Sequence, residues 1–455
     1  MMRSMYSGVS GLSVHQTKMD VIGNNIANVN TVGYKKSVAS FQEAFSQVVQ
    51  GGSAPYAGRG GTNPQQIGLG MKLGSISTVY TKGPTQRTDN PSDLMIDGDG
   101  FFMVSTDPKF ENKFYTRAGN FTFDLEGNMC TPDGQRLLGK FIGGDNYAKA
   151  LGIQKDRDFD GVKLSKSIVA PATSSVKVEV VGNLDSRTPI IDDGNTPDIH
   201  ENQYKTDAIV KDSLGNSYKM EVTIQKTASN KWKVSKLTVK NIANDKLVYD
   251  QAPNKELEFN QSGELITVDP STGNPIDPVI TLLNGDFITT EMGGGFFGTV
   301  SGTNELKLDL SRIKQYANDS DAKGHDAMVN GQIGRSAGSY NGYTVDPSGK
   351  VIVSFTNGME QAIWQIKLAK FDNPMGLVKV GNNYYKSSPN SGEANIGIPG
   401  ASGLGAINGG CLEMSNVDLS MEFTEMITTQ RGFQANSRII TTSDEMLQEL
   451  TNLKR

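Results

Sequence analysis

The chain has 455 residues and a formal net charge of −5, from 44 basic and 49 acidic side chains. This mild acidity excludes the basic stripe of a nucleic-acid-binding protein, so we expect no nucleic-acid partner. Two cysteines, Cys130 and Cys411, are too few for a disulfide scaffold or a four-cysteine zinc site, and we expect both thiols to be inert. The 51 glycines favour a mostly β protein with many turns.

The N-terminal segment predicts an amphipathic helix of limited intrinsic stability. Every seventh residue there is apolar, as expected for one position of a coiled-coil heptad. These residues are Met5, Leu12, Met19 and Ile26. Gly8, Gly11 and Gly23 lie in the same segment, and each costs about 1 kcal/mol relative to Ala in a helix interior. The segment lacks the charged cap and continuous apolar block of a cleavable secretory signal.

The middle of the chain reads as β-structure between two connecting regions. Gly, Ser and Pro are frequent after the N-terminal segment and before the C-terminal one, so we assign 31–70 and 400–417 to a connecting region. Between them apolar and polar residues alternate with a period of two. The alternation on both sides of Asn357-Gly358 predicts a β-hairpin.

We divide this β-rich part of the chain into two domains. Residues 71–170 and 301–399 are expected to form an inner antiparallel β domain. Residues 171–300 begin at a proline, are rich in alternating segments and end near a glycine run, so we expect them to be an inserted outer β domain.

The C-terminal segment carries the stronger helical pattern. Five consecutive positions at a step of seven are apolar: Leu419, Met426, Phe433, Ile440 and Leu447. Asp418 or Ser420 is suited to cap the start of the helix. A helix of this kind is marginal alone and stable in a bundle.

The predicted fold class is α+β and mostly β. Coiled-coil-forming terminal helices, over 1–30 and 418–455, flank an antiparallel β domain with an inserted second β domain. In one interpretation the two helices close a single globular domain. In the other, which we favour, they also pack against copies of themselves, because the β-rich middle of the chain offers them no other helical neighbour.

The motifs that resemble catalytic or metal sites each lack a required part. Residues 334–338 match the G-x-S-x-G nucleophile elbow, but turn residues follow where a helix is needed. The three histidines all precede the serine: His15, His200 and His325. Residues 156–161 match the start of a calcium loop, whose last position holds Ser167 instead of glutamate. We therefore expect no catalytic residue, no metal and no cofactor.

Six ordered segments carry a resemblance to a known family. They are SGVSGL at 7–12, NNIANVNTVGYK at 24–35, LMIDGDGFF at 94–102, YTRAGNFTFDL at 115–125, SNVDL at 415–419 and QRGFQANSRII at 430–440. In these segments the chain resembles the bacterial flagellar rod and hook family of axial proteins. Within that family it is more similar to the hook members than to the rod members, which are shorter and lack a large inserted domain.

The resemblance implies a structural role rather than an enzymatic one. Hook subunits polymerise into a flexible curved tube, a universal joint that transmits torque from the rod to the filament. The alternative within the family is a distal-rod-type axial protein with an enlarged outer domain. A rival from another class is an extracellular enzyme or carbohydrate-binding module that uses the outer β domain.

The resemblance also implies a location, partners and an interface. It places the chain in the extracellular hook of the flagellar basal body, after export through the flagellar type III apparatus without a cleavable signal peptide. Its partners would be further copies of itself, the distal rod protein, the hook cap protein during assembly and the hook–filament junction proteins. The polymerisation interface would consist of Met5, Leu12, Met19, Ile26, Leu419, Met426, Phe433, Ile440 and Leu447.

Overall fold

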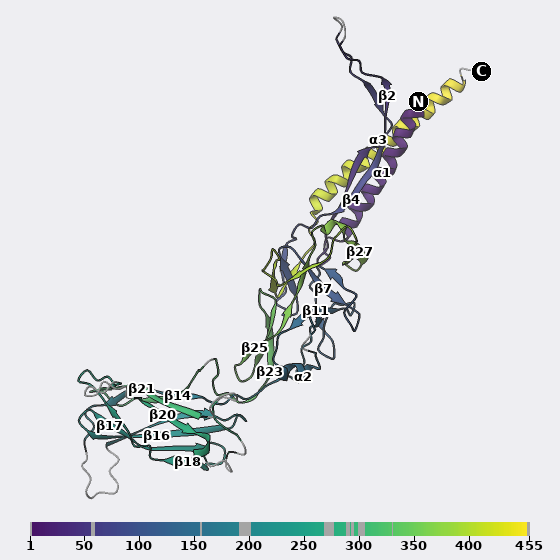
Figure 1. The fold of residues 1–455 in the computed structure, drawn as a ribbon. Helices are drawn as coiled ribbons and strands as arrows, with labels where there is room; N and C mark the ends of the chain where they lie inside the picture. Colours follow the sequence, from purple (N-terminus) through teal and green to yellow (C-terminus); the bar gives the residue numbers. More distant parts are fainter. Residues whose placement is uncertain are drawn as a thin grey trace. The chain divides into compact units, whose positions relative to one another are not determined.

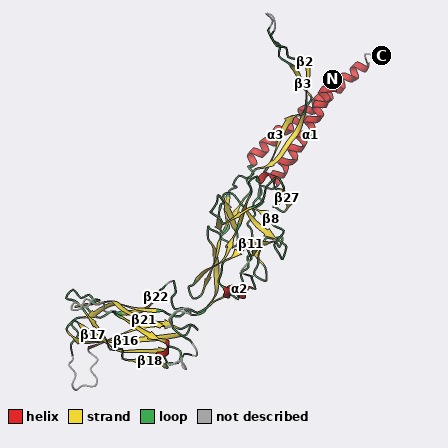
Figure 2. Ribbon diagram, viewed as in Figure 1, coloured by secondary structure: helices red, strands yellow, loops and turns green. Residues whose placement is uncertain are grey.

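A computed structural model describes residues 2–55, 60–154, 157–190, 202–267, 277–287, 292, 295–298, 305–329 and 331–452. The chain forms two compact units. The first, here called the helical unit, comprises Met1–Lys166, Gly342–Val353 and Glu360–Arg455. The second, here called the sandwich unit, comprises Ser167–Asn341 and Ser354–Met359. Helix is concentrated at the two ends of the chain and strands dominate the rest (Figure 2), which confirms the predicted fold class.

The two terminal helices of the helical unit lie side by side (Figure 1). Helix α1 spans Met2–Ala27 and helix α3 spans Leu419–Asn452. Of the two candidate caps at the start of α3, the structure selects Asp418. Its carboxylate oxygen Oδ1 accepts hydrogen bonds from the backbone N–H groups of Ser420 at 2.9 Å and Met421 at 3.3 Å.

A β ribbon follows α1 where the sequence suggested only a connecting region. Strand β1 (Ser37–Glu43) pairs with β4 (Met71–Thr78), and β2 (Ser46–Gln50) pairs with β3 (Gln65–Gly68), both antiparallel. Most of these side chains are at least partly exposed, so the ribbon has little of the buried alternation that identifies strands in a sequence. Backbone hydrogen bonds, rather than apolar burial, define it.

The β domain of the helical unit is built on the strand order β25-β11-β7-β8-β28-β27, in which each neighbouring pair is antiparallel. Its strands and short helices up to residue 166 are β5 (Thr85–Arg87), β6 (Leu94–Asp97), β7 (Phe101–Ser105), β8 (Phe114–Thr116), β9 (Thr122–Phe123), β10 (Met129–Cys130), β11 (Arg136–Phe141), α2 (Asp145–Leu151) and β12 (Asp160–Gly161). The later ones are β25 (Glu360–Ile366), β26 (Leu368–Lys370), η3 (Pro374–Gly376), β27 (Val378–Gly381), β28 (Tyr384–Lys386), β29 (Asn395–Gly397), β30 (Ala406–Gly409) and β31 (Cys411–Glu413).

Aromatic side chains form the core of this β domain. The rings of Tyr115 and Phe371 meet edge to face with centroids 4.7 Å apart, and Phe101 packs against Phe371 at 6.0 Å. These residues belong to one buried cluster, which Met103 and Leu138 also join. Strands β30 and β31 pair with β6 and β5, so part of the second predicted connecting region, 400–417, is β-structure of this domain.

The sandwich unit consists of two sheets around one apolar core. One sheet has the order β20-β21-β14-β22 and the other β15-β16-β17-β18, with β19 paired to β17. Buried side chains of both sheets form a single cluster around Trp232. The strands are β14 (Lys177–Asp185), β15 (Gln203–Lys211), β16 (Ser217–Ala228), β17 (Lys231–Asn241), β18 (Leu247–Gln251), β19 (Lys255–Glu258), β20 (Val279–Leu283), β21 (Glu305–Tyr316) and β22 (Lys323–Ala327), with the short helix η2 at Asn284–Asp286. Strand β13 (Val169–Ala170) precedes them. Strands β23 (Gly338–Val345) and β24 (Lys350–Phe355) follow, and their residues 342–345 and 350–353 belong to the helical unit.

The sandwich unit extends further along the chain than the predicted insertion, 171–300. The predicted end lies outside the described residues, but β21 pairs in parallel with β14 and antiparallel with β20, and β22 pairs with β14. The unit therefore continues to Asn341. The reason is a pairing between strands more than 100 positions apart in the chain, which local alternation does not reveal.

Gly33 follows α1 at a point where the backbone leaves no room for a side chain. Its φ is +67°, and a Cβ atom would lie 2.5 Å from the backbone nitrogen of Ala118. Gly134 has a similar φ of +80° with no atom within 4 Å of the Cβ position.

We predict that Gly33→Ala lowers the free energy of unfolding of the helical unit by about 1–3 kcal/mol more than Gly134→Ala does. Both variants carry the backbone strain of a positive φ, worth roughly 1 kcal/mol or more. Only the first adds an overpacked backbone contact, which typically costs about 1–3 kcal/mol. Urea unfolding of the two variants measures the difference, and equal losses would show that the close approach at Gly33 is unimportant.

Candidate assembly surface

The seam between α1 and α3 is lined by glycine and polar side chains. A Cβ atom on Gly11 would lie 2.7 Å from Nδ2 of Asn436, and one on Gly8 would lie 3.2 Å from Ile440. On the opposite helix, a Cβ atom on Gly432 would lie 2.8 Å from the ring of His15. These glycines weaken the segments as isolated helices, but they allow the two helix backbones to approach closely. The sequence alone did not predict this role.

Charged and amide groups continue the seam toward the end of α1. Lys18 Nζ lies 3.1 Å from Glu425 Oε2. The Asn25 amide is 1% exposed and fully hydrogen-bonded: Nδ2 donates to Glu422 Oε2 at 3.1 Å and to the Ser37 carbonyl at 2.8 Å. Its Oδ1 accepts from Tyr34 Oη and from the Ser37 backbone N–H. A buried amide with every group paired fixes the register of α1 against α3 and β1.

His15 lies in this seam beside Phe41 and Lys18. Its ring packs edge to face on Phe41 of β1, with centroids 6.1 Å apart. Its buried Nδ1 has no hydrogen-bond partner among the described residues. Burial and the nearby Lys18 charge both lower the pKa of His15. The seam thus disfavours a second positive charge beside Lys18.

The apolar stripes predicted from the sequence are at most partly buried in the single chain. Ile440 reaches α1 at Gly8. None of the nine side chains is fully buried. Met5, Leu12, Met19, Ile26, Met426, Phe433, Ile440 and Leu447 are half-buried, and Leu419 is exposed. The buried helix residues include instead Val14, Ile22, Glu422, Thr429 and Ser443.

Both helices expose further large apolar side chains. Those exposed by 42–67% are Tyr6, Val9, Met421, Phe423, Ile427, Ile439 and Met446. The seven-residue repeat did not identify four of them, because they do not fall on it: Tyr6, Met421, Phe423 and Ile427. Counting apolar residues on every face of each helix would have identified them. The β2–β3 ribbon adds Phe45, Val48, Val49 and Ile67, each also about half exposed or more. Exposed large apolar side chains in this number on two helices and a ribbon indicate a candidate interaction site.

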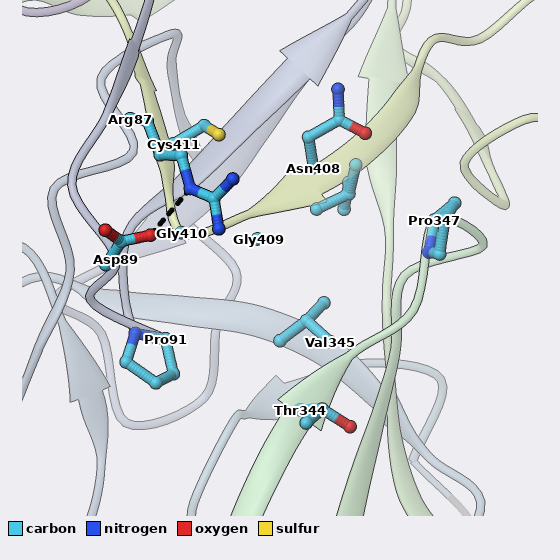
Figure 3. A pocket seen from close by; sticks show the side chains of 11 residues that line it. Arg87, Asp89, Pro91, Thr344, Val345, Pro347, Asn408, Gly409, Gly410 and Cys411 are labelled. Atoms are coloured by element: carbon cyan, nitrogen blue, oxygen red, sulfur yellow. Dashed lines mark hydrogen bonds and ion pairs between the residues drawn. The ribbon is translucent and has the colours of Figure 1, made fainter.

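The β domain also has a hollow of about 570 Å³, whose lining does not resemble a catalytic site (Figure 3). Arg87 and Cys411 are paired positions of β5 and β31 at its edge. Arg87 Nε is bound to Asp89 Oδ1 at 2.6 Å, and both side chains are largely exposed. No histidine lines the hollow beside Cys411. Cys130 is buried, and burial raises the pKa of its thiol.

The other motifs singled out in the sequence do not form sites in the described residues. Ser336 lies in a loop, since the next regular element is strand β23 and not a helix. Asp156 of the calcium-like motif lies outside the described residues, and Asp160 is in strand β12. Within the described part of the chain, no three metal-ligating side chains come together. None of its helices combines the length and apolar character needed to span a bilayer.

Models of four protein families match successive parts of the chain. "Flagella basal body rod protein" matches residues 5–35, and "Flagellar hook protein FlgE/F/G D1 domain" matches 95–184. "Flagellar basal body protein FlaE D2 domain" matches 183–327, and "Flagellar basal body rod FlgEFG protein C-terminal" matches 408–453. The first and last of these include most of α1 and of α3.

Curated relatives match along the whole chain. The flagellar hook protein FlgE of Borreliella burgdorferi is 38% identical over 462 residues, covering 100% of both chains. The flagellar hook protein FlgE of Treponema pallidum is 35% identical over 476 residues with the same coverage. The flagellar basal-body rod protein FlgG of Bacillus subtilis is 31% identical over 456 residues, again covering 100% of both chains.

We predict that Gly432→Ala and Gly23→Ala change helix content in opposite directions. Each substitution adds up to about 1 kcal/mol of intrinsic helix preference. A Cβ atom at Gly23 meets nothing within 4 Å, so that variant should gain helical signal. At Gly432 the Cβ atom collides with the His15 ring and separates the helices. Far-ultraviolet circular dichroism of the full chain measures both, and a gain in Gly432→Ala as large as in Gly23→Ala would contradict the seam.

Proposed function

As a member of the flagellar hook protein family, this chain is a structural subunit of the bacterial flagellar hook, and we propose that it polymerises through its terminal helices into a flexible curved tube that transmits torque from rod to filament. The observation that carries the proposal is the pair of helices that meet along glycines and polar groups and leave seven large apolar side chains exposed. A helix pair of this kind needs further apolar partners, and copies of the same pair supply them.

The exposed apolar side chains are numerous enough to drive assembly. Burying a large apolar side chain completely stabilises by about 1.5–3 kcal/mol. Covering the seven side chains that are 42–67% exposed in the single chain therefore contributes on the order of 5 kcal/mol per subunit. We propose that the interface combines the two sets. It comprises Met5, Leu12, Met19, Ile26, Leu419, Met426, Phe433, Ile440 and Leu447, together with Tyr6, Val9, Met421, Phe423, Ile427, Ile439 and Met446.

The family also supports proposals on location and partners. We place the chain in the extracellular hook, exported by the flagellar type III apparatus without a cleavable signal peptide. Its partners are further copies of itself, the distal rod protein, the hook cap protein during assembly and the hook–filament junction proteins. The role is structural and involves no enzymatic step. One of the three relatives above is named as a rod protein, but two are named as hook proteins and both have the higher identity.

We predict that Ile427→Asp and Phe433→Asp fold as monomers but fail to polymerise. Ile427 is 58% exposed in the single chain, so a carboxylate there is hydrated until a neighbouring subunit covers it. Burying an unpaired charge in an apolar interface then costs several kcal/mol. Because about 1.4 kcal/mol corresponds to a tenfold change in an equilibrium constant, the critical concentration should rise more than tenfold.

The matched control is Gln434→Asp, which adds the same charge to an exposed polar position of α3. Sedimentation and electron microscopy of each variant measure polymer formation, and urea unfolding verifies the monomer. Normal tubes from Ile427→Asp and Phe433→Asp would show that this face of α3 is not the assembly surface.

A further inference from the structure

Three charged side chains are buried together where the terminal segments join the β domain. Lys35 and Glu413 side chains are 0% exposed and Arg117 is 4% exposed. Lys35 Nζ lies 2.6 Å from Glu413 Oε1 and also donates to the Thr81 carbonyl at 2.7 Å. Glu413 Oε1 accepts a further hydrogen bond from the Gly83 backbone N–H at 3.0 Å. The carboxylate is thus already well bound before Arg117 is considered.

Arg117 is poorly satisfied in this cluster. Its Nη1 lies 3.5 Å from Glu413 Oε2, at the limit of a hydrogen bond. Its buried Nε–H has no acceptor among the described residues. The guanidinium also packs over the Phe101 ring, with 5.3 Å between its central carbon and the ring centroid. A guanidinium binds a planar oxyanion through N–H donors held in a fixed fork, and the unpaired Nε–H of Arg117 is one of these donors.

The charges of the cluster do not balance. Two buried cations, Lys35 and Arg117, share the single buried carboxylate of Glu413. The charge of Asp99, which is largely exposed and pairs with Lys370, offsets part of the Arg117 charge. A buried charge whose hydrogen bonds are incompletely satisfied is disfavoured. Burial lowers the pKa of Arg117. It also lowers the pKa of Lys35, because the charge of Glu413 offsets the effect of burial only in part. The cluster therefore has the composition of a site that awaits an anion.

Arg117 borders a pocket of about 180 Å³, far larger than the space that one water molecule needs. Aromatic walls come from Tyr80, Phe101 and Phe371. At the edge, Lys370 Nζ lies 3.2 Å from Asp99 Oδ2, and the Asp99 side chain is 70% exposed. The pocket thus has a buried guanidinium inside and a solvent-accessible ion pair at its mouth.

We infer that this pocket binds a carboxylate, which pairs with the incompletely hydrogen-bonded guanidinium of Arg117. The carboxylate group matches the planar fork of a guanidinium, and the aromatic walls accommodate its apolar end. It can come from a free small carboxylate in solution or from an acidic side chain of a second copy of this chain. The site stands on geometry within one chain and does not depend on the polymerisation proposed above.

The test uses full-length monomer and sodium formate as the probe. Thermal unfolding is followed while formate replaces chloride at constant ionic strength, which separates specific binding from screening. A bound carboxylate raises the melting temperature in a saturable manner. Arg117→Met should abolish this dependence, whereas Arg87→Met, an arginine exposed on the same unit, should retain it.

Two exposed variants decide the question even if Arg117→Met does not fold. Asp99→Asn removes a repelling charge from the mouth and should tighten formate binding about threefold or more. Lys370→Met removes an attracting charge and should weaken binding to a similar extent. An unchanged melting temperature in formate, or equal affinity in wild type, Asp99→Asn and Lys370→Met, would overturn the inference.

Co-sedimentation of labelled formate with the assembled polymer distinguishes the two sources of the carboxylate. Binding to the polymer with the monomer's affinity assigns the pocket to a free carboxylate. Binding to the monomer but not to the polymer assigns it to an acidic side chain of a neighbouring subunit. The inference itself fails if neither form binds formate.

Discussion

The close contact of α1 and α3 along Gly8, Gly11 and Gly432 is the constraint from which the other properties follow. Glycines bring the two backbones together at these points, and amide and charged groups such as Asn25 and Glu422 set the register. Several large apolar side chains of both helices, among them Tyr6 and Ile427, remain exposed. A polar seam specifies the pairing but stabilises it weakly, and the exposed apolar faces then make association with further copies favourable.

A second set of contacts ties the helices to the β domain. The Gly33 backbone N–H donates to the Glu413 carbonyl at 2.8 Å, and the Glu413 side chain binds Lys35. The segment after α1 and the strand before α3 are therefore joined directly. Because Glu413 lies near the end of the chain, this joint forms only when both terminal segments are present. Buried hydrogen bonds and charges therefore connect the helix pair to the β domain.

The sequence predicted the elements better than their contacts. The seven-residue repeats predicted both helices, and the hairpin signal at Asn357-Gly358 corresponds to a turn in which the Phe355 N–H donates to the Met359 carbonyl. The end of the sandwich unit was missed because it depends on the parallel pairing of β14 with β21. The seam was missed because a glycine in a helix reads as a local weakness until its tertiary neighbour is known. The local sequence around Arg117 does not reveal its burial, since Lys35 and Glu413 meet it only in space.

Hydrogen exchange of the monomer and of the polymer tests the central claim most directly. If the polar seam holds the helices only weakly and neighbouring subunits complete them, backbone amides of residues 2–27 and 419–452 should exchange at least about a hundredfold faster in the monomer than in the polymer. Amides of β7 and β11 should exchange at the same rate in both. Slow exchange of the helix amides in a verified monomer, at the rate found in the polymer, would show that the helix pair is stable by itself and would contradict the account.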